Sequence, residues 1–132
     1  MSDGSMYPGT ASEYREGYRQ QATYILRRAA AAAATVVASD PTAVIIISGD
    51  HGPRFGFSVL DAELTDATEV LPVFLAIRWA ARGSGAPHVD SLVNVYRAVL
   101  NQYLGAHLAM RAKRSFVSPL FRPYNLLERA VR

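Results

Sequence analysis

The sequence predicts an α/β domain in which a mainly parallel sheet is flanked by helices. Two observations predict this class: the apolar run from Val44 to Ile47 is uninterrupted, and helical and strand-like patterns alternate along the chain. A continuous apolar run is typical of a strand that is covered on both faces. The chain has 132 residues, enough for one modest core. We therefore expect a flexible tail over residues 1–11 and a single α/β domain over residues 12–132.

The first helix is predicted over about residues 12–38. Thr10 and Glu13 have the spacing of a capping box. Side chains that are apolar or aromatic then recur at intervals of three or four residues: Tyr14, Tyr18, Ala22, Ile25, Ala29, Ala32 and Val36. Pro41 disfavours helical geometry in the residue before it, so the helix is expected to end there.

Two strands are predicted next, over residues 43–48 and 73–79. The segment between them is rich in glycine and irregular up to about Asp66, as in a loop over a site. A short helical turn is expected from Asp66 to Leu71. Pro72 stands at the start of the second strand, where a missing N–H is tolerated.

The rest of the chain predicts one helix and two short elements. After the break at residues 83–87, Asp90 or Ser91 is expected to cap a helix that Gly105 closes. An edge strand is predicted over residues 114–118 and a last helical turn over residues 124–131. Three aromatic side chains are expected in the core: Tyr96, Tyr103 and Phe116.

Composition excludes several classes of protein. Half of the residues are hydrophobic and 19% are charged, so the chain is not a disordered tail. The net charge is +3, and basic residues gather near the end of the chain, where a solvated surface explains them better than a nucleic-acid partner. There is no cysteine, which excludes disulfides and thiolate metal sites. The longest apolar block, residues 29–38, is shorter than the ~20 residues that cross a bilayer.

Asp50 and His51 directly follow the first predicted strand. In open α/β sheets ligands bind just beyond the carboxyl ends of the strands. A carboxylate oxygen and a neutral imidazole nitrogen are good ligands for zinc or manganese, so this pair is the candidate metal site. Asp is also a common turn former, and the pair as ordinary loop residues stays an alternative. His88 and His107 fit exposed loop residues better than further ligands.

Four blocks follow one another in a specific order: residues 43–54 with Asp50-His51-Gly52, then residues 71–77, 91–105 and 114–118. In this order they resemble the C-terminal part of sulfatase-like hydrolases of the alkaline phosphatase superfamily, which includes membrane-anchored phosphoglycerol transferases. The resemblance covers roughly residues 14–130. It implies a partial alkaline-phosphatase-like fold from which the N-terminal half is absent.

The resemblance also implies a chemistry. Asp50 and His51 would hold a divalent metal ion (Mn, Zn, Mg or Ca), and the substrate would be a sulfate or phosphate ester. Arg54 is a candidate for contact with that ester, although a surface salt bridge explains it equally well. The nucleophile of the family is not recognisable, since no Ser or Thr in residues 1–42 follows a strand. We therefore expect a segment of an enzyme that is inactive by itself.

Expectations about partners follow from the same resemblance. Membrane association would come only through an anchor in the absent N-terminal part, which would place the parent enzyme outside the cytoplasm. A sheet without its remaining strands exposes an unpaired edge, so we expect self-association. The alternative function is a non-catalytic small α/β module that binds a partner. The sequence itself leaves the compartment open.

Overall fold

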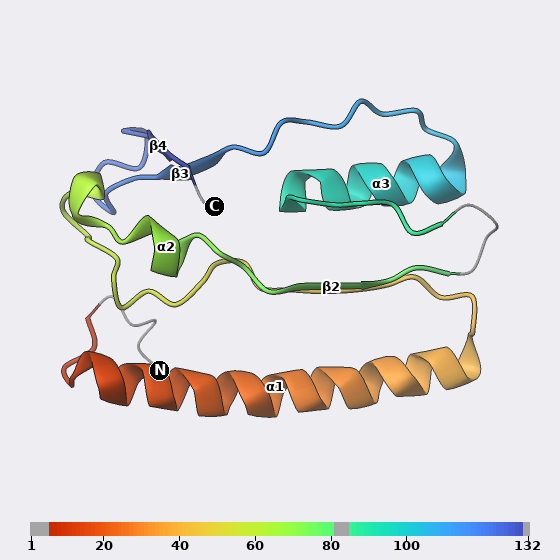
Figure 1. Cartoon of the computed structure of the whole chain (residues 1–132), viewed down its shortest axis with the longest axis horizontal. Helices are drawn as coiled ribbons and strands as arrows, with labels where there is room; N and C mark the ends of the chain where they lie inside the picture. The colour runs from red at the N-terminus through yellow and green to blue at the C-terminus, as the bar shows by residue number, and fades with distance from the viewer. Residues whose placement is uncertain (1–5, 81–84, 131–132) are drawn as a thin grey trace. The chain divides into compact units, whose positions relative to one another are not determined.

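The computed structural model describes residues 6–80 and 85–130 (Figure 1). The chain separates into two compact units, Met1–Ala80 with Ser115–Arg132, and Ala81–Arg114. The tail predicted over residues 1–11 falls partly on residues 1–5, and the predicted break at 83–87 partly on residues 81–84. These positions lie outside the described residues.

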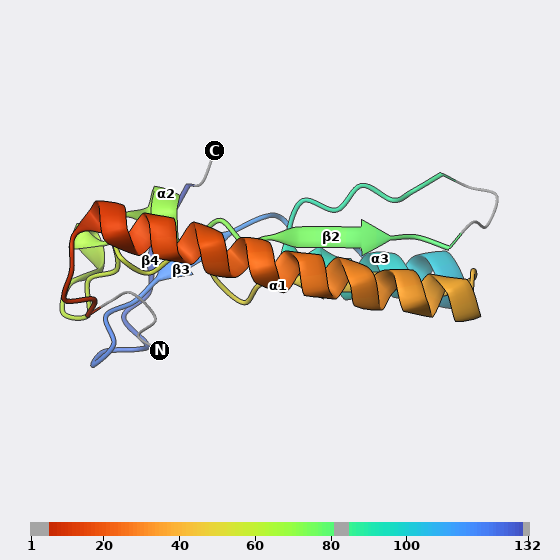
Figure 2. The same ribbon diagram turned by 90° about the horizontal axis from the view of Figure 1, so that it is seen from below.

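The first unit begins with the long helix α1, Ala11–Ser39, which Figure 2 shows as one continuous element. The predicted capping box is confirmed: the Thr10 N–H donates to the Glu13 carboxylate at 2.8 Å, and the Glu13 N–H donates to the Thr10 hydroxyl at 3.3 Å. The Thr10 N–H and the Thr10 hydroxyl both donate to the Glu13 carboxylate, and these two bonds hold the pKa of Glu13 below its ordinary value. Among the helices of the described residues, none is both long enough and apolar enough to cross a membrane.

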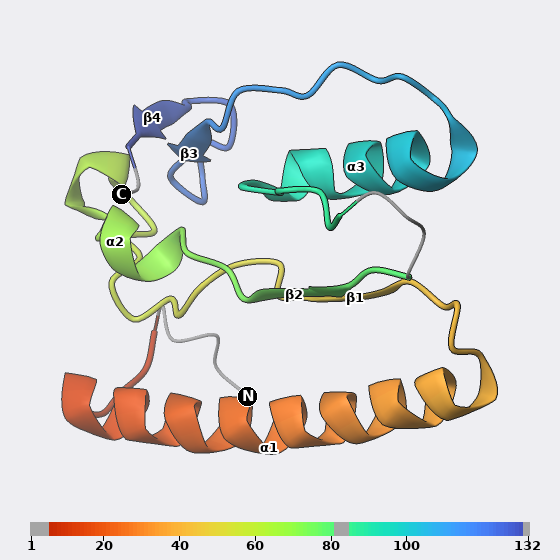
Figure 3. The same cartoon turned by 45° about the vertical axis from the view of Figure 1, so that its right-hand side comes forward.

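The strands of this unit form two small antiparallel sheets (Figure 3). In the first sheet, β1 (Ile45–Ser48) pairs with β2 (Leu75–Arg78), and Ile46 lies opposite Ile77. In the second, β3 (Ser115–Val117) pairs with β4 (Leu127–Arg129). The prediction of a mainly parallel, alkaline-phosphatase-like sheet is therefore wrong. The helical turn predicted over residues 124–131 is also wrong, because β4 lies there.

The wrong strand direction has a physical reason. An apolar run reports that a strand is covered on both faces, but not which way its neighbour runs. Parallel neighbours need a crossover of a dozen or more residues, usually a helix. The connection between β1 and β2, residues 49–74, is long enough for a crossover but contains no long helix, only the short turns η1 (Ala62–Leu64) and α2 (Ala67–Val70), and the chain returns antiparallel. The helical turn predicted from Asp66 to Leu71 is confirmed as α2.

The core of the first unit is small. Its buried side chains are Ala62, Val70 and Val117, against which Phe57, Leu71 and Leu127 pack. Ile45, Ile46 and Ile47 of β1 are only half-buried. Within the described residues, no large side chain is completely removed from solvent.

The second unit contains α3, Leu92–Leu104, which ends at Gly105 as predicted. Gly105 has a φ of 62°, the left-handed conformation that closes many helices. Ser91 occupies the N-cap position without a side-chain capping bond. The buried residues of the helix are Asn94, Val95 and Ala98.

Two of the three aromatic residues expected in the core are exposed. Tyr96 follows Val95 directly and therefore turns away from the buried stripe, so its side chain is 70% exposed. Phe116 of β3 is 39% exposed, and Tyr103 is half-buried. For Tyr96 and Phe116 the prediction of a core position is wrong.

Asparagine side chains of α3 hold the extended segment that follows the helix. The Asn94 amide donates to the Arg111 carbonyl at 2.8 Å and accepts from the Arg111 N–H at 2.9 Å. Asn101 makes the same pair of bonds with Leu108, at 2.8 and 2.6 Å. Each amide thus replaces the backbone partner that a neighbouring strand would offer.

Candidate metal site

Backbone hydrogen bonds on both sides fix the position of Asp50 and His51. The Gly49 N–H donates to the Phe74 carbonyl at 2.9 Å, which continues the β1–β2 ladder by one bond. The Gly52 N–H donates to the Val70 carbonyl at 3.0 Å. The two candidate ligands therefore lie between two anchored residues, at the carboxyl end of β1.

Gly52 is buried against the backbone beside α2. A Cβ at this position would lie 2.5 Å from the Glu69 carbonyl oxygen and 2.5 Å from that of Pro72. Only a residue without a side chain allows this approach, because real Cβ atoms do not come so close to backbone oxygens. The glycine after the acid and imidazole pair is therefore needed for close packing of the loop.

The His51 ring has a defined orientation. Its Nδ1 lies 2.7 Å from the Gly52 carbonyl oxygen. A carbonyl oxygen only accepts, so Nδ1 carries the proton in this bond, and the lone pair of the neutral ring is on Nε2. Such a bond from the second ring nitrogen to a carbonyl is the usual support of a metal-binding histidine.

The Asp50 carboxylate faces that Nε2 atom. Asp50 Oδ2 lies 3.7 Å from His51 Nε2, and Asp50 Oδ1 accepts from the His51 N–H at 3.1 Å. Two atoms at bond lengths of about 2.0–2.2 Å from a tetrahedral zinc ion would be roughly 3.4 Å apart. The Asp50 side chain is 92% exposed and that of His51 45%, so a cation in solution can reach both. The two side chains fit as two ligands of one ion.

The remaining ligands are not supplied by the part of the chain that the structure describes. Within it, no group of three or more His, Cys, Asp or Glu side chains could hold a metal ion. Water or another molecule would have to complete the coordination. His88 and His107, which the sequence indicated as loop residues, are both exposed and belong to the second unit.

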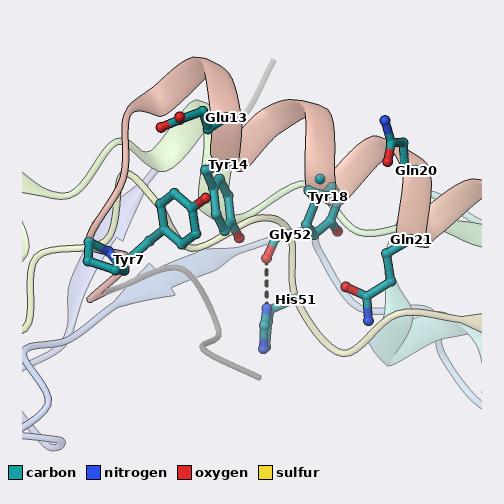
Figure 4. A pocket seen from close by; sticks show the side chains of 10 residues that line it. Tyr7, Glu13, Tyr14, Tyr18, Gln20, Gln21, His51 and Gly52 are labelled. Atoms are coloured by element: carbon teal, nitrogen blue, oxygen red, sulfur yellow. Dashed lines mark hydrogen bonds between the residues drawn. The ribbon is translucent and has the colours of Figure 1, made fainter.

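Three hollows in the surface of the first unit share His51. One of about 420 Å³ is lined by Asp50 and His51 together with Tyr18 of α1. One of about 330 Å³ is lined by His51 and Arg54. The third, of about 760 Å³, is lined by His51 and the aromatic rings of Tyr7, Tyr14 and Tyr18 (Figure 4). The structure thus brings all of the predicted site residues to hollows around one imidazole.

Arg54 is positioned by an aromatic residue of α1. The Arg54 N–H donates to the Tyr14 hydroxyl at 3.3 Å, and the Tyr14 ring stacks on Phe55 at a centroid distance of 5.4 Å. The Arg54 guanidinium lies over the Phe57 ring, 4.3 Å from its centroid. Helical spacing alone indicated that Tyr14 packs inward, but nothing in the sequence pointed to its contact with this loop.

Tyr18 lines one of these hollows together with Asp50. Burial raises the pKa of the Tyr18 phenol, and the neighbouring Tyr14 and Asp50 raise it further. The phenol therefore stays protonated and is available as a hydrogen-bond donor at neutral pH. Sequence reasoning assigned Tyr18 to the packed face of the helix and missed this position.

Comparison of the chain with protein-family models, with curated proteins and with solved structures finds no match.

Proposed function

We propose that this chain contributes Asp50 and His51 as two ligands of a divalent metal ion in a sulfatase-like hydrolase or transferase that acts on sulfate or phosphate esters. The observation that carries the proposal is the bond from His51 Nδ1 to the Gly52 carbonyl, which aims Nε2 at the Asp50 carboxylate. The resemblance of the four sequence blocks supports the same chemistry.

The side chains of the loop have distinct roles in this proposal. A bound divalent cation would offset the negative charge of the ester group as it is attacked. Asp50 and His51 would hold that ion, and Arg54 would pair with an ester oxygen from the adjoining hollow. The proposal assigns no nucleophile to this chain. It is therefore tested by measuring metal binding and not ester hydrolysis.

The test is calorimetric titration of the native chain with Mn²⁺ and with Zn²⁺, repeated on Asp50→Ala and His51→Ala. Each variant should weaken binding by at least about tenfold, since each removes a ligand atom. His107→Ala is the matched control, because it removes an imidazole from an exposed position outside the loop. Binding that is equal in the native chain and in both site variants would contradict the proposal.

A non-catalytic binding module is the second candidate function. Large apolar side chains on α1 favour it, because Tyr24 is 64% exposed and Ile25 53% exposed. Exposed apolar surface of this kind often marks a protein interaction site. The same titration separates the two candidates: a native chain that binds neither metal ion leaves the module as the better explanation.

A further inference from the structure

Three tyrosine rings gather around the hollow of about 760 Å³ in the first unit (Figure 4). The centroid of the Tyr14 ring lies 5.4 Å from that of Tyr7 and 6.0 Å from that of Tyr18. The planes of these neighbouring rings are inclined at 58° and 37°, so a group that lies between them can contact more than one ring. The volume is in the range of small-molecule sites, about 300–1,000 Å³.

The arginine side chains near these tyrosines are bound elsewhere. Arg15 pairs with Glu69 at 3.4 Å, and Arg19 pairs with a carboxylate of its own helix at 2.8 Å. The Arg54 guanidinium lies over the Phe57 ring, 4.3 Å from its centroid. Among the described residues, no lysine or arginine lines the hollow. Its aromatic wall is therefore open to a cation from outside the chain.

The charge of the hollow is negative. Glu13 is the only Asp, Glu, Lys or Arg among the described residues that line it. Its Oε2 atom accepts from both the N–H and the hydroxyl of Thr10, so the carboxylate belongs to the cap of α1 and supplies charge more than hydrogen-bond acceptors. A primary ammonium group has three N–H donors to satisfy, whereas a quaternary ammonium group has none. Aromatic rings bind a quaternary ammonium group through their faces.

We propose that this hollow binds a small soluble molecule that carries a quaternary ammonium group. The methylated cation lies against the rings of Tyr7, Tyr14 and Tyr18, within about 6 Å of their centroids, where the ring quadrupoles attract it. Glu13 balances its charge and offsets the positive end of the α1 dipole, which would otherwise repel a cation. Gln21 lines the same hollow and offers an amide to a polar group on the rest of the ligand.

The first test compares a charged ligand with an uncharged one of the same shape. Calorimetric titration uses choline and the alcohol in which a tert-butyl group replaces the trimethylammonium group. Choline should bind at least about fivefold more tightly, because only the cation is attracted by the rings and the carboxylate. Equal affinities, or no binding of choline, would overturn the proposal. The buffer is free of divalent ions, so the result is independent of whether Asp50 and His51 bind a metal ion.

Substitutions of Tyr18 test the aromatic ring itself. Tyr18→Leu keeps apolar volume but removes the ring, so choline affinity should fall by at least about threefold, while Tyr18→Phe keeps the ring and should bind within about twofold of the native chain. Tyr24→Leu is the matched control, since Tyr24 belongs to the same helix and does not line the hollow. Circular dichroism checks that all three variants fold. Equal losses for Tyr18→Leu and Tyr24→Leu would overturn the site.

Glu13→Gln tests the negative charge. Glutamine at the third position of a helix also completes a capping box, so α1 should keep its first turn. Choline affinity should fall by about threefold, as expected for the loss of one exposed charge, and affinity for the uncharged alcohol should not change. Choline binding that is unchanged, or that falls together with binding of the alcohol, would contradict the proposal.

A lipid surface can present the same chemical group. Phosphatidylcholine vesicles carry a trimethylammonium group on every lipid, and cosedimentation with them separates the two sources. A hollow of about 760 Å³ can hold a whole small molecule, so the chain should stay in the supernatant. Pelleting with the vesicles that free choline reverses would assign the site to a lipid headgroup and would overturn a soluble ligand.

Discussion

Polar side chains in two regions of the molecule are held in opposite ways. On α3, the amides of Asn94 and Asn101 each make two hydrogen bonds to one residue of the extended segment that follows the helix. After β1, His51 uses one ring nitrogen to hold itself in place, and its second nitrogen faces the exposed Asp50 carboxylate. Asn94 is 2% exposed, while the Asp50 side chain is 92% exposed.

The difference separates structural polar groups from groups available for binding. A buried amide whose donor and acceptor are both satisfied stabilises the fold and has nothing left to offer a ligand. A fixed imidazole with a free lone pair beside an exposed carboxylate stabilises little, and under the proposed function it would hold a cation. Substitutions in the first region should therefore change stability, and those in the second should change binding.

Asn94→Ala should have the largest effect on stability. It removes both partly buried hydrogen bonds to the backbone of Arg111 and opens a cavity at a position that is 2% exposed, so we expect a loss of about 3 kcal/mol. Chemical denaturation followed by circular dichroism measures this loss. Asn101→Ala, at a half-buried position with the same bonding pattern, should lose about 1 kcal/mol. Equal losses for the two variants would show that burial does not distinguish them.

Gly52→Ala should lower stability by an intermediate amount, and it should change metal affinity as well. The new Cβ would meet two carbonyl oxygens at 2.5 Å, and the backbone must move, at a cost of about 2 kcal/mol. Because the Gly52 carbonyl also orients His51, metal binding should weaken together with stability.

Gly17→Ala is the control for this substitution. Gly17 lies within α1, and a Cβ there meets nothing within 4 Å. Alanine should therefore stabilise the helix by roughly 0.5–1 kcal/mol and leave metal binding unchanged. A Gly52→Ala variant that is as stable as Gly17→Ala would refute the close packing of the loop.

Local signals in the sequence predicted most elements and their ends. The Thr10 and Glu13 capping box and the Gly105 stop depend on residues only a few positions apart, and both are present in the structure. Asp50 and His51 could also be recognised as a pair from the sequence, because they are adjacent in the chain.

Features that depend on distant segments were not predictable. Strand direction depends on how the connection between β1 and β2 returns, and the apolar run contains no information about that path. The buried face of α3 is set by the extended segment that binds Asn94, so apolar periodicity wrongly placed Tyr96 inside. The need for Gly52 arises from the carbonyls of Glu69 and Pro72, seventeen and twenty residues further along the chain.

Tyr14→Phe should lower stability less than Asn94→Ala or Gly52→Ala, and it measures how firmly α1 holds the loop. The substitution removes the hydroxyl that accepts from the Arg54 N–H at 3.3 Å, while the ring keeps its stacking on Phe55. The loss of one neutral hydrogen bond should cost about 1 kcal/mol in chemical denaturation. Tyr24→Phe is the control, since Tyr24 of the same helix is 64% exposed and lines none of the three hollows around His51, and it should change stability by less than about 0.5 kcal/mol.

Metal affinity shows whether the bond between Tyr14 and Arg54 positions Asp50 and His51. The bond from the Gly52 N–H to Val70 anchors the loop independently of Tyr14, so Mn²⁺ and Zn²⁺ should bind Tyr14→Phe as they bind the native chain. An affinity that falls by tenfold or more in Tyr14→Phe, with Tyr24→Phe unchanged, would contradict this independence. Tyr14 would then be a positioning residue for Asp50 and His51, and the loop would owe its geometry to α1 as much as to its own backbone.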